Sequence, residues 1–432
     1  MKIRTAAFIT ATEAEPRKYG KQIVVGGMLD HLCDRLGAEN VHLVQVGRLD
    51  QKRPNVPYQR HVIAKPKAHS QLCALIRHVV LPRFGVRGDR ISLQEAALRS
   101  PEIARQLRAL LDAIEPDLEV WDTVRLGQYA HAVPPRAGTR RLLYADDLFS
   151  ERYNAMLRES ETRGLGGNPG GEFKKLLPGP LRELLGDPRV YRPLLKIERG
   201  LVAEAEERQP HWFDATYLVG PGEAERLRAR CPGPWIDSLP PLLREPRRRE
   251  RHPTRTPVFT FLGGFDYAPN HDGLGWFLEF CRDAVLSVLP NVQIRVVGSG
   301  TERGLPQAAA WGDRVRFSGW VDDLDAVLAQ SVALLSPLRT GSGVKIEVLE
   351  AMARGLPVVA TPAGVEGIDA RTTSGCLVAE TPEKLARAMR SACDPRTNRW
   401  LSIAARRFWN RTYSPRVVRR RYDTIFGLVP VT

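Results

Sequence analysis

No run of 18 or more apolar residues occurs in the 432-residue sequence, so we expect no membrane-spanning helix. Only a brief apolar stretch separates the basic start, MKIR, from Glu13, which predicts a first β-strand and no signal peptide. The six cysteines form no CxxC pair, and the nine histidines form no HExxH cluster. These absences favour reduced thiols in the cytoplasm and give no support to a metal site.

Acidic residues are outnumbered, with 49 Asp and Glu against 64 Lys and Arg, and the formal net charge is +15. Such an excess suits nucleic acid, an anionic membrane surface or phosphorylated small molecules, but it is equally typical of a solvated surface in an arginine-rich protein. The sequence contains no RNP-like aromatic motif, zinc finger or basic zipper. Nucleic acid is therefore not an expected partner.

Strand-like and helix-like segments alternate along the chain. In the second half we expect strands within 257–265, 292–300, 314–321, 332–338, 357–362 and 375–380, and helices at 271–289, 344–355 and 381–393. In the first half we expect strands within 3–11, 40–47, 116–123, 139–148 and 213–220, and a helix at 28–37 that the pair Gly26-Gly27 opens. This alternation predicts an α/β fold with doubly wound parallel sheets.

Composition divides the chain at 244–255, REPRRRERHPTR, which holds six arginines and almost nothing apolar. This segment predicts a linker outside any core. We expect a first domain at 1–243 with a polar, helix-rich insert at 151–210, a linker at 244–256, a second domain at 257–410 and an amphipathic helix within 411–432.

The segment PLRTGSGVKIEVLEAMARG, 337–355, carries the clearest chemical signal. Ligands of parallel sheets bind at the carboxyl ends of strands, and the turn Gly341-Ser342-Gly343 follows such a strand. Glycines let backbone amides approach a ligand, and a helix beginning near Val344 would favour an anion there. Lys345 in its first turn adds a full charge, so the turn predicts a diphosphate site. The alternative is a tight turn beside a solvated lysine.

Two glutamates follow on the same predicted helix. Glu350 lies among apolar residues and needs a partner, which the paired hydroxyls of a ribose would provide. A salt bridge to an arginine is the alternative. Glu347 lies one turn earlier, where it could face the ligand or solvent.

The segment SPLRTGSGVKIEVLEAMARGLPVVATPAGVEGI resembles the second-domain signature of retaining GT-B glycosyltransferases of the GT4-type family, the glycosyl transferases group 1. FLGGFDYAPNHDGLGWF, VRFSGWVDDL, YADDLFSERY and the Gly26-Gly27 segment are similar to other parts of that family. The resemblance implies two Rossmann-like domains facing across a cleft, with a C-terminal helix that crosses back to the first domain.

The resemblance also implies roles for particular residues. The donor site would comprise Gly26, Gly27, Val321, Arg339, Gly341, Ser342, Gly343, Val344, Lys345, Glu347 and Glu350. Of these, Lys345 would also be catalytic, together with Asp146 and Asp147 on the acceptor side, where many family members carry a histidine. Ser342 departs from the family, since many members have a glutamate there, and Gly264 and Asn270 lie where an arginine and a lysine are common.

We therefore expect a metal-independent, hexosyltransferase-like enzyme without a cofactor. It would move a sugar from a nucleotide-diphosphate donor to a glycan, lipid-linked or small-molecule acceptor, and would retain the anomeric configuration. The alternative is a non-catalytic sugar-nucleotide binder or partner subunit, which the replacement of glutamate by Ser342 would favour. The basic, leucine-rich stretch 172–185 is a candidate for contact with an anionic membrane at its cytoplasmic face, unless its leucines face the domain core.

Overall fold

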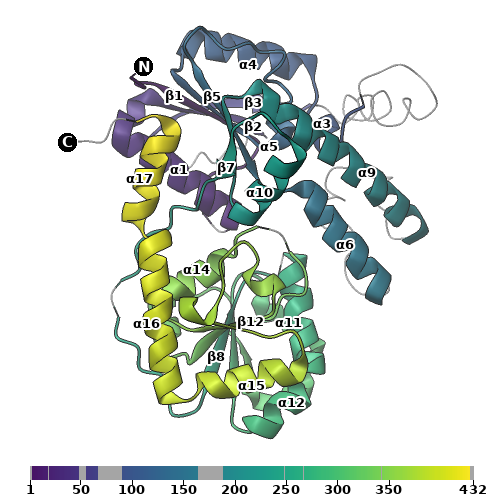
Figure 1. Cartoon of the computed structure of the whole chain (residues 1–432), viewed down its shortest axis with the longest axis vertical. Helices are drawn as coiled ribbons and strands as arrows, with labels where there is room; N and C mark the ends of the chain where they lie inside the picture. Colours follow the sequence, from purple (N-terminus) through teal and green to yellow (C-terminus); the bar gives the residue numbers. More distant parts are fainter. Residues whose placement is uncertain are drawn as a thin grey trace. The chain divides into compact units, whose positions relative to one another are not determined.

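The computed structural model describes residues 2–17, 19–47, 55–66, 90–163, 188–247, 249–265, 267–341 and 343–428. The chain folds into two compact units (Figure 1). Unit 1 comprises Met1–Leu165, Pro169–Leu242 and Val418–Thr432, and unit 2 comprises Gly166–Asn168 and Leu243–Val417. The end of the chain thus returns to the unit in which the chain begins.

Unit 1 is built on a seven-stranded parallel sheet of order β3-β2-β1-β4-β5-β6-β7. Its strands are β1 Ala6–Thr10, β2 Val41–Gly47, β3 Gln59–Ala64, β4 Leu118–Asp122, β5 Arg140–Asp146, β6 Ala215–Leu218 and β7 Ile236–Ser238. Its α-helices are α1 Gly20–Leu36, α3 Leu93–Ala96, α4 Pro101–Ile114, α5 Thr123–Gly127, α6 Phe149–Arg163, α9 Pro188–Arg208 and α10 Pro221–Arg230. Helix α17, Pro415–Phe426, joins this unit from Val418 onward.

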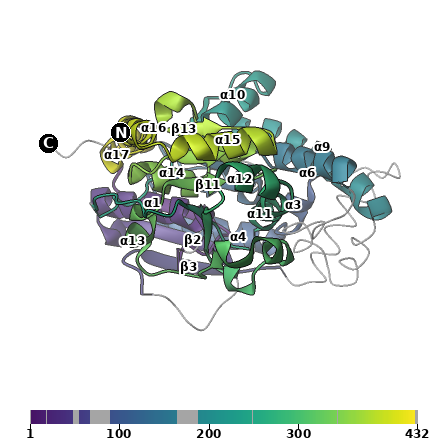
Figure 2. The ribbon, with the colours of Figure 1, turned by 90° about the horizontal axis from the view of Figure 1, so that it is seen from below.

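Unit 2 is built on a six-stranded parallel sheet of order β10-β9-β8-β11-β12-β13. Its strands are β8 Val258–Leu262, β9 Gln293–Val297, β10 Val315–Phe317, β11 Ala333–Ser336, β12 Val358–Ala360 and β13 Cys376–Val378. Its α-helices are α11 Ala268–Phe280, α12 Arg282–Val288, α13 Leu324–Ala329, α14 Ile346–Ala353, α15 Pro382–Ala392 and α16 Pro395–Thr412. The second view shows α15 and α16 along the same side of unit 2 (Figure 2).

Local sequence explains where these helices begin. The Thr381 hydroxyl accepts a hydrogen bond from the Lys384 amide and caps α15, and Pro382 occupies the first helical position. Leu385 and Met389 then fall on one face and are buried in the unit 2 core. The rings of Phe277 and Trp311 stack in the same core, with centroids 5.6 Å apart.

The strand order places a topological switch point in each sheet. In unit 1 the chain runs outward from β1 in one direction and then resumes at β4, on the other side of β1. In unit 2 the same reversal occurs between β8 and β11. Loops leaving the carboxyl ends of two such neighbouring strands diverge and open a crevice, which is where ligands of doubly wound sheets bind. Each unit therefore offers one preferred site.

Two sequence expectations are wrong. The predicted helix at 271–289 is two helices, α11 and α12, which meet at Cys281. The pair Gly26-Gly27 does not open a helix but lies inside α1, which begins at Gly20. A Cβ on Gly27 would lie 2.6 Å from the carbonyl oxygen of Leu242, so the absence of a side chain serves close packing against the helix.

One residue of the arginine-rich segment packs against unit 2. The Arg251 guanidinium donates hydrogen bonds to the carbonyls of Ser331, Val332 and Gly355 in unit 2, at 3.0 to 3.2 Å. Burial lowers the pKa of Arg251 to about 10. An arginine can leave water here because carbonyl oxygens replace its hydration.

Candidate functional site

The turn after β11 forms the centre of the candidate site in unit 2. Gly341 has φ +130° and Gly343 has φ +73°, conformations that side chains disfavour, so both glycines are required for this path. The Lys345 ammonium donates a hydrogen bond to the Gly343 carbonyl at 2.9 Å. A Cβ on Gly341 would lie 3.5 Å from that ammonium. The structure thus brings together the turn glycines and the lysine, as the sequence predicted.

Lys345 differs from its prediction in two respects. It is the N-cap residue of α14, which begins at Ile346, and so lies just before the first turn and not within it. Its side chain is buried, with 5% of the residue exposed, so the alternative of a solvated lysine is wrong. A buried ammonium beside the amide end of a helix is a concentrated positive site, because the helix dipole adds to the charge.

Neighbouring loops support this turn. Gly367, with φ +81°, packs so closely that a Cβ would lie 3.0 Å from the Gly343 carbonyl carbon. The Tyr267 hydroxyl, from the loop after β8, would lie 3.6 Å from a Cβ on Gly341. Both were missed as candidates, although the glycine of GVEGI and the tyrosine of GGFDY lie in segments that resemble the family. The β8 and β11 loops flank the switch point, so the turn lies at the preferred ligand position.

The two glutamates of α14 differ in environment. The Glu350 carboxylate pairs with Arg354 one turn later, and Arg354 also donates to Asp325 at 2.7 Å. The salt bridge that the sequence left open is therefore present, and ribose binding by Glu350 stays a prediction. Burial raises the pKa of Glu347, although the Lys345 charge opposes this rise. The charge of Lys345 therefore acts on the Glu347 carboxylate.

The remaining predicted donor residues of unit 2 lie around the same edge. The Arg339 guanidinium stacks on the Trp276 ring, 4.6 Å from its centroid. Val321 follows the turn after β10, where the Gly319 carbonyl accepts a hydrogen bond from the Gly298 amide at 2.9 Å. Val344 joins the turn to the N-cap of α14. Ser342 lies outside the described residues.

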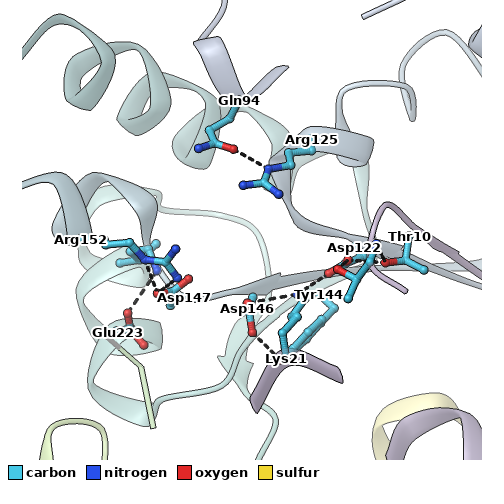
Figure 3. A network of polar contacts seen from close by, with 12 residues as sticks. Thr10, Lys21, Gln94, Asp122, Arg125, Tyr144, Asp146, Asp147, Arg152 and Glu223 are labelled. Atoms are coloured by element: carbon cyan, nitrogen blue, oxygen red, sulfur yellow. Dashed lines mark hydrogen bonds and ion pairs between the residues drawn. The ribbon is translucent and has the colours of Figure 1, made fainter. Parts of the chain in front are cut away.

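A second polar cluster lies at the switch point of unit 1 (Figure 3). The Thr10 hydroxyl at the end of β1 donates to Asp122 Oδ2 at the end of β4, at 2.6 Å. The Lys21 ammonium, from the first turn of α1, lies 2.5 Å from Asp122 Oδ1 and 3.1 Å from Asp146 Oδ2. The Tyr144 hydroxyl donates to Asp146 Oδ1 at 2.8 Å. One cation therefore holds two carboxylates at the edge of the sheet.

Asp146 and Asp147 point into different surroundings (Figure 3). Asp146 has φ +70°, unusual for a residue with a side chain, and one fifth of its side chain is exposed. Burial raises the pKa of Asp146, as do the charges of Asp147 and Asp122, whereas Lys21 lowers it. Asp147 is buried and pairs with Arg152 at 2.5 Å. Backbone strain of this kind clusters at functional sites, which singles out Asp146 over Asp147.

Lys21 and Asp122 were missed by the sequence predictions. Asp122 ends a predicted strand, which was a usable signal, but Lys21 gave none because its helix was expected to begin later. Gly26 and Gly27 lie further along α1 and pack against Arg17 and Leu242 within unit 1. Their proposed contact with a donor stays a prediction.

Residues 256–394 match the family model Glycosyl transferases group 1. The matched region runs from β8 through α15 and includes the turn, Lys345 and both glutamates of α14. A curated relative, the "Uncharacterized 44.6 kDa protein in cps region" of Klebsiella pneumoniae, is 24% identical over 162 residues, which span 36% of this chain and 41% of that protein.

Two solved structures are similar over nearly the whole chain. Sucrose-phosphate synthase from Thermosynechococcus elongatus has a TM-score of 0.63 and 15% identity, covering 98% of both chains. Anabaena HepE in complex with UDP has a TM-score of 0.63 and 11% identity, covering 98% of this chain and 99% of that one. The two parallel, Rossmann-like sheets thus match the GT-B fold of glycosyltransferases, which confirms the predicted fold class.

Proposed function

We propose that the protein is a retaining glycosyltransferase that uses a nucleotide-diphosphate sugar and needs no metal ion. The observation that carries this proposal is the buried Lys345 ammonium, held beside two glycines with positive φ at the N-terminus of α14. This positive site lies in the region that matches the group 1 glycosyltransferases. It has the features that a leaving diphosphate needs: glycine backbone without side chains, a helix dipole and a fixed charge.

The donor would lie across the β8–β11 switch point of unit 2. Its diphosphate would contact the Gly341–Lys345 turn, and its ribose hydroxyls would reach Glu350. The backbone at Val321 would contact the base, and Arg339 would add a second cation near the phosphates. Because a structurally similar protein, HepE, was solved with UDP, uridine diphosphate sugars are the first donors to test.

The reaction would break the bond between the anomeric carbon and the diphosphate oxygen. The oxygen of the acceptor hydroxyl would form its bond to that carbon on the face that the diphosphate leaves, and its proton would pass to a departing phosphate oxygen. Lys345 would stabilise the charge that develops on the diphosphate, which is the largest electrostatic demand of the step.

On the acceptor side, Asp146 would accept a hydrogen bond from the hydroxyl that attacks. Its two oxygens are already oriented by Lys21 and Tyr144, and one fifth of its side chain is exposed. Such preorganisation limits the motion that the reaction would require. Asp147 would stabilise the fold and would not contact the acceptor, because its carboxylate is turned to Arg152.

Two measurements test the proposal. Thermal denaturation with a panel of nucleotide sugars should show stabilisation by one donor class, since a bound ligand shifts unfolding by mass action. NMR of the glycoside formed from that donor should then show the donor's anomeric configuration. Inversion of configuration would refute the retaining mode, and the absence of stabilisation by any nucleotide sugar would refute the donor site.

A further inference from the structure

Helix α16 carries an exposed stripe of basic and apolar side chains along one face. The stripe, called here the α16 stripe, consists of Arg396, Arg399, Trp400, Ile403, Arg407 and Arg411. These positions recur every three or four residues and therefore share one side of the helix. Trp400 is 51% exposed and Ile403 is 44% exposed, so two large apolar side chains lie between the arginines in contact with water.

The opposite face anchors α16 to the core of unit 2. Leu401, Ala405 and Trp409 are buried. The Asn398 amide donates to the Val332 carbonyl at 2.9 Å, and the Ser402 hydroxyl donates to the Gly355 carbonyl at 2.6 Å. The helix thus already has a complete packing face, and the α16 stripe is additional to it.

The α16 stripe carries a net positive charge. No Asp or Glu occurs within 395–412. Among the described residues, none of the four stripe arginines forms an ion pair, whereas Arg406, at the edge of the stripe, approaches Glu245 at 3.9 Å. The charge of Asp394, the N-cap residue of α16, acts on Arg396, so Arg399, Arg407 and Arg411 carry the net positive charge around Trp400 and Ile403.

We propose that the α16 stripe docks on an anionic lipid bilayer. Arginines attract phosphate headgroups, a tryptophan ring prefers the headgroup region, and an isoleucine gains by entering the boundary with the acyl chains. The phosphate backbone of a nucleic acid would satisfy the arginines but would leave Ile403 in water. The combination of charge with two exposed apolar side chains thus favours the membrane. This inference goes beyond sugar transfer, because it requires neither donor nor acceptor.

Co-sedimentation of the full chain with vesicles, without any nucleotide sugar, tests this docking. We expect binding to vesicles of equal parts phosphatidylglycerol and phosphatidylcholine, weak binding to phosphatidylcholine alone, and release at high salt. Each stripe arginine should contribute about fivefold to the partition coefficient. The variant Arg396→Glu/Arg407→Glu should therefore lose at least tenfold, and Trp400→Ser should weaken binding without changing its salt dependence.

The matched control is Arg108→Glu/Arg316→Glu, which changes the net charge equally at exposed arginines on α4 and β10. This control should retain most of the binding, and thermal denaturation should show that both double variants fold. Equal losses in the two double variants would overturn the proposal, as would a failure of the wild-type chain to bind anionic vesicles. Stripe-dependent binding to heparin without binding to vesicles would instead assign the stripe to a soluble polyanion. Because the assay contains no sugar donor, none of these outcomes bears on glycosyl transfer.

Discussion

The ammonium of Lys21 lies 3.1 Å from Oδ2 of Asp146 and joins that carboxylate to Asp122 across the switch point of unit 1. Removing this cation would break the ion pairs of both carboxylates. We expect Lys21→Met to lower the free energy of unfolding by about 3 kcal/mol, as for other broken buried ion pairs. Denaturant unfolding measures this loss, and Lys21→Arg should restore most of it.

The same variant should change the pH dependence of transfer. Burial, Asp147 and Asp122 raise the pKa of Asp146, and Lys21 opposes them. Without Lys21 the pKa of Asp146 should therefore rise further, so the acidic limb of kcat/KM for acceptor should move to higher pH. Lys21→Arg, which keeps the charge, is the control. An unmoved acidic limb in Lys21→Met would contradict the positioning role of Lys21.

Asp146 and Asp147 should respond differently to replacement by Asn. Asp146→Asn should reduce kcat/KM for acceptor by about 100-fold, because the attacking hydroxyl loses the carboxylate that orients it, while donor binding stays intact. Asp147→Asn should mainly lower stability, because it breaks the pair with Arg152. Steady-state kinetics and thermal denaturation of both variants separate the two effects. Wild-type transfer by Asp146→Asn would remove Asp146 from the acceptor site.

Glu350 offers a test of donor recognition against a structural role. Glu350→Gln should raise the KM for donor more than it lowers kcat, since the ribose contact is made in the ground state as well. Arg354→Met is the companion variant, because it breaks the same ion pair, together with the pair to Asp325, and leaves the Glu350 carboxylate. A shift in thermal stability shared by both variants, with no change in donor KM for Glu350→Gln, would show that Glu350 stabilises α14 and does not bind the donor.

Glu223 should make stability depend on pH. Its carboxylate is buried on α10 and accepts a hydrogen bond from the Leu148 amide at 3.1 Å, and burial together with the Asp147 charge raises its pKa to about 8. Between the ordinary pKa of glutamate and this value, the folded state holds a proton that the unfolded state releases. The free energy of unfolding therefore falls as pH rises through this window, by at most about 1.4 kcal/mol per pH unit.

Replacing Glu223 should remove that dependence. Denaturant unfolding between pH 5 and pH 8 should show a flatter profile for Glu223→Gln than for the wild type. The exposed Glu225 lies on the same helix, so Glu225→Gln provides the control and should follow the wild-type profile. Parallel profiles for the wild type and Glu223→Gln would contradict the buried, protonated state of Glu223.

Local sequence was sufficient to predict the turn in unit 2, but it did not predict the polar cluster in unit 1. The turn, Lys345 and α14 are consecutive in sequence, so their spacing alone predicted that they meet. Lys21 and Asp122 are far apart in the chain, and only the pairing of β1 with β4 brings them together. No pattern in the residues near Lys21 reports that pairing.

Glycines caused the error in the predicted start of α1. Gly26 and Gly27 resemble a helix boundary because glycine weakens helices, yet they lie inside α1, where close packing against Leu242 requires a residue without a side chain. At Gly341 and Gly343 the glycine pattern did predict a turn, because there the backbone itself needs positive φ. The residue type is the same, but Gly27 serves close packing, whereas Gly341 and Gly343 serve the backbone conformation.

The release of nucleoside diphosphate from a sugar donor tests the central claim most directly. The wild-type chain should release it from one class of nucleotide sugar, faster when acceptor is present, and Lys345→Ala should slow this release about 100- to 1000-fold because it removes a preorganised charge from the leaving group. Lys384→Ala, which removes an exposed lysine of α15 in the same unit, should release it at the wild-type rate. Release by Lys345→Ala at the wild-type rate, or no release from any nucleotide sugar by the wild-type chain, would contradict glycosyl transfer at this turn.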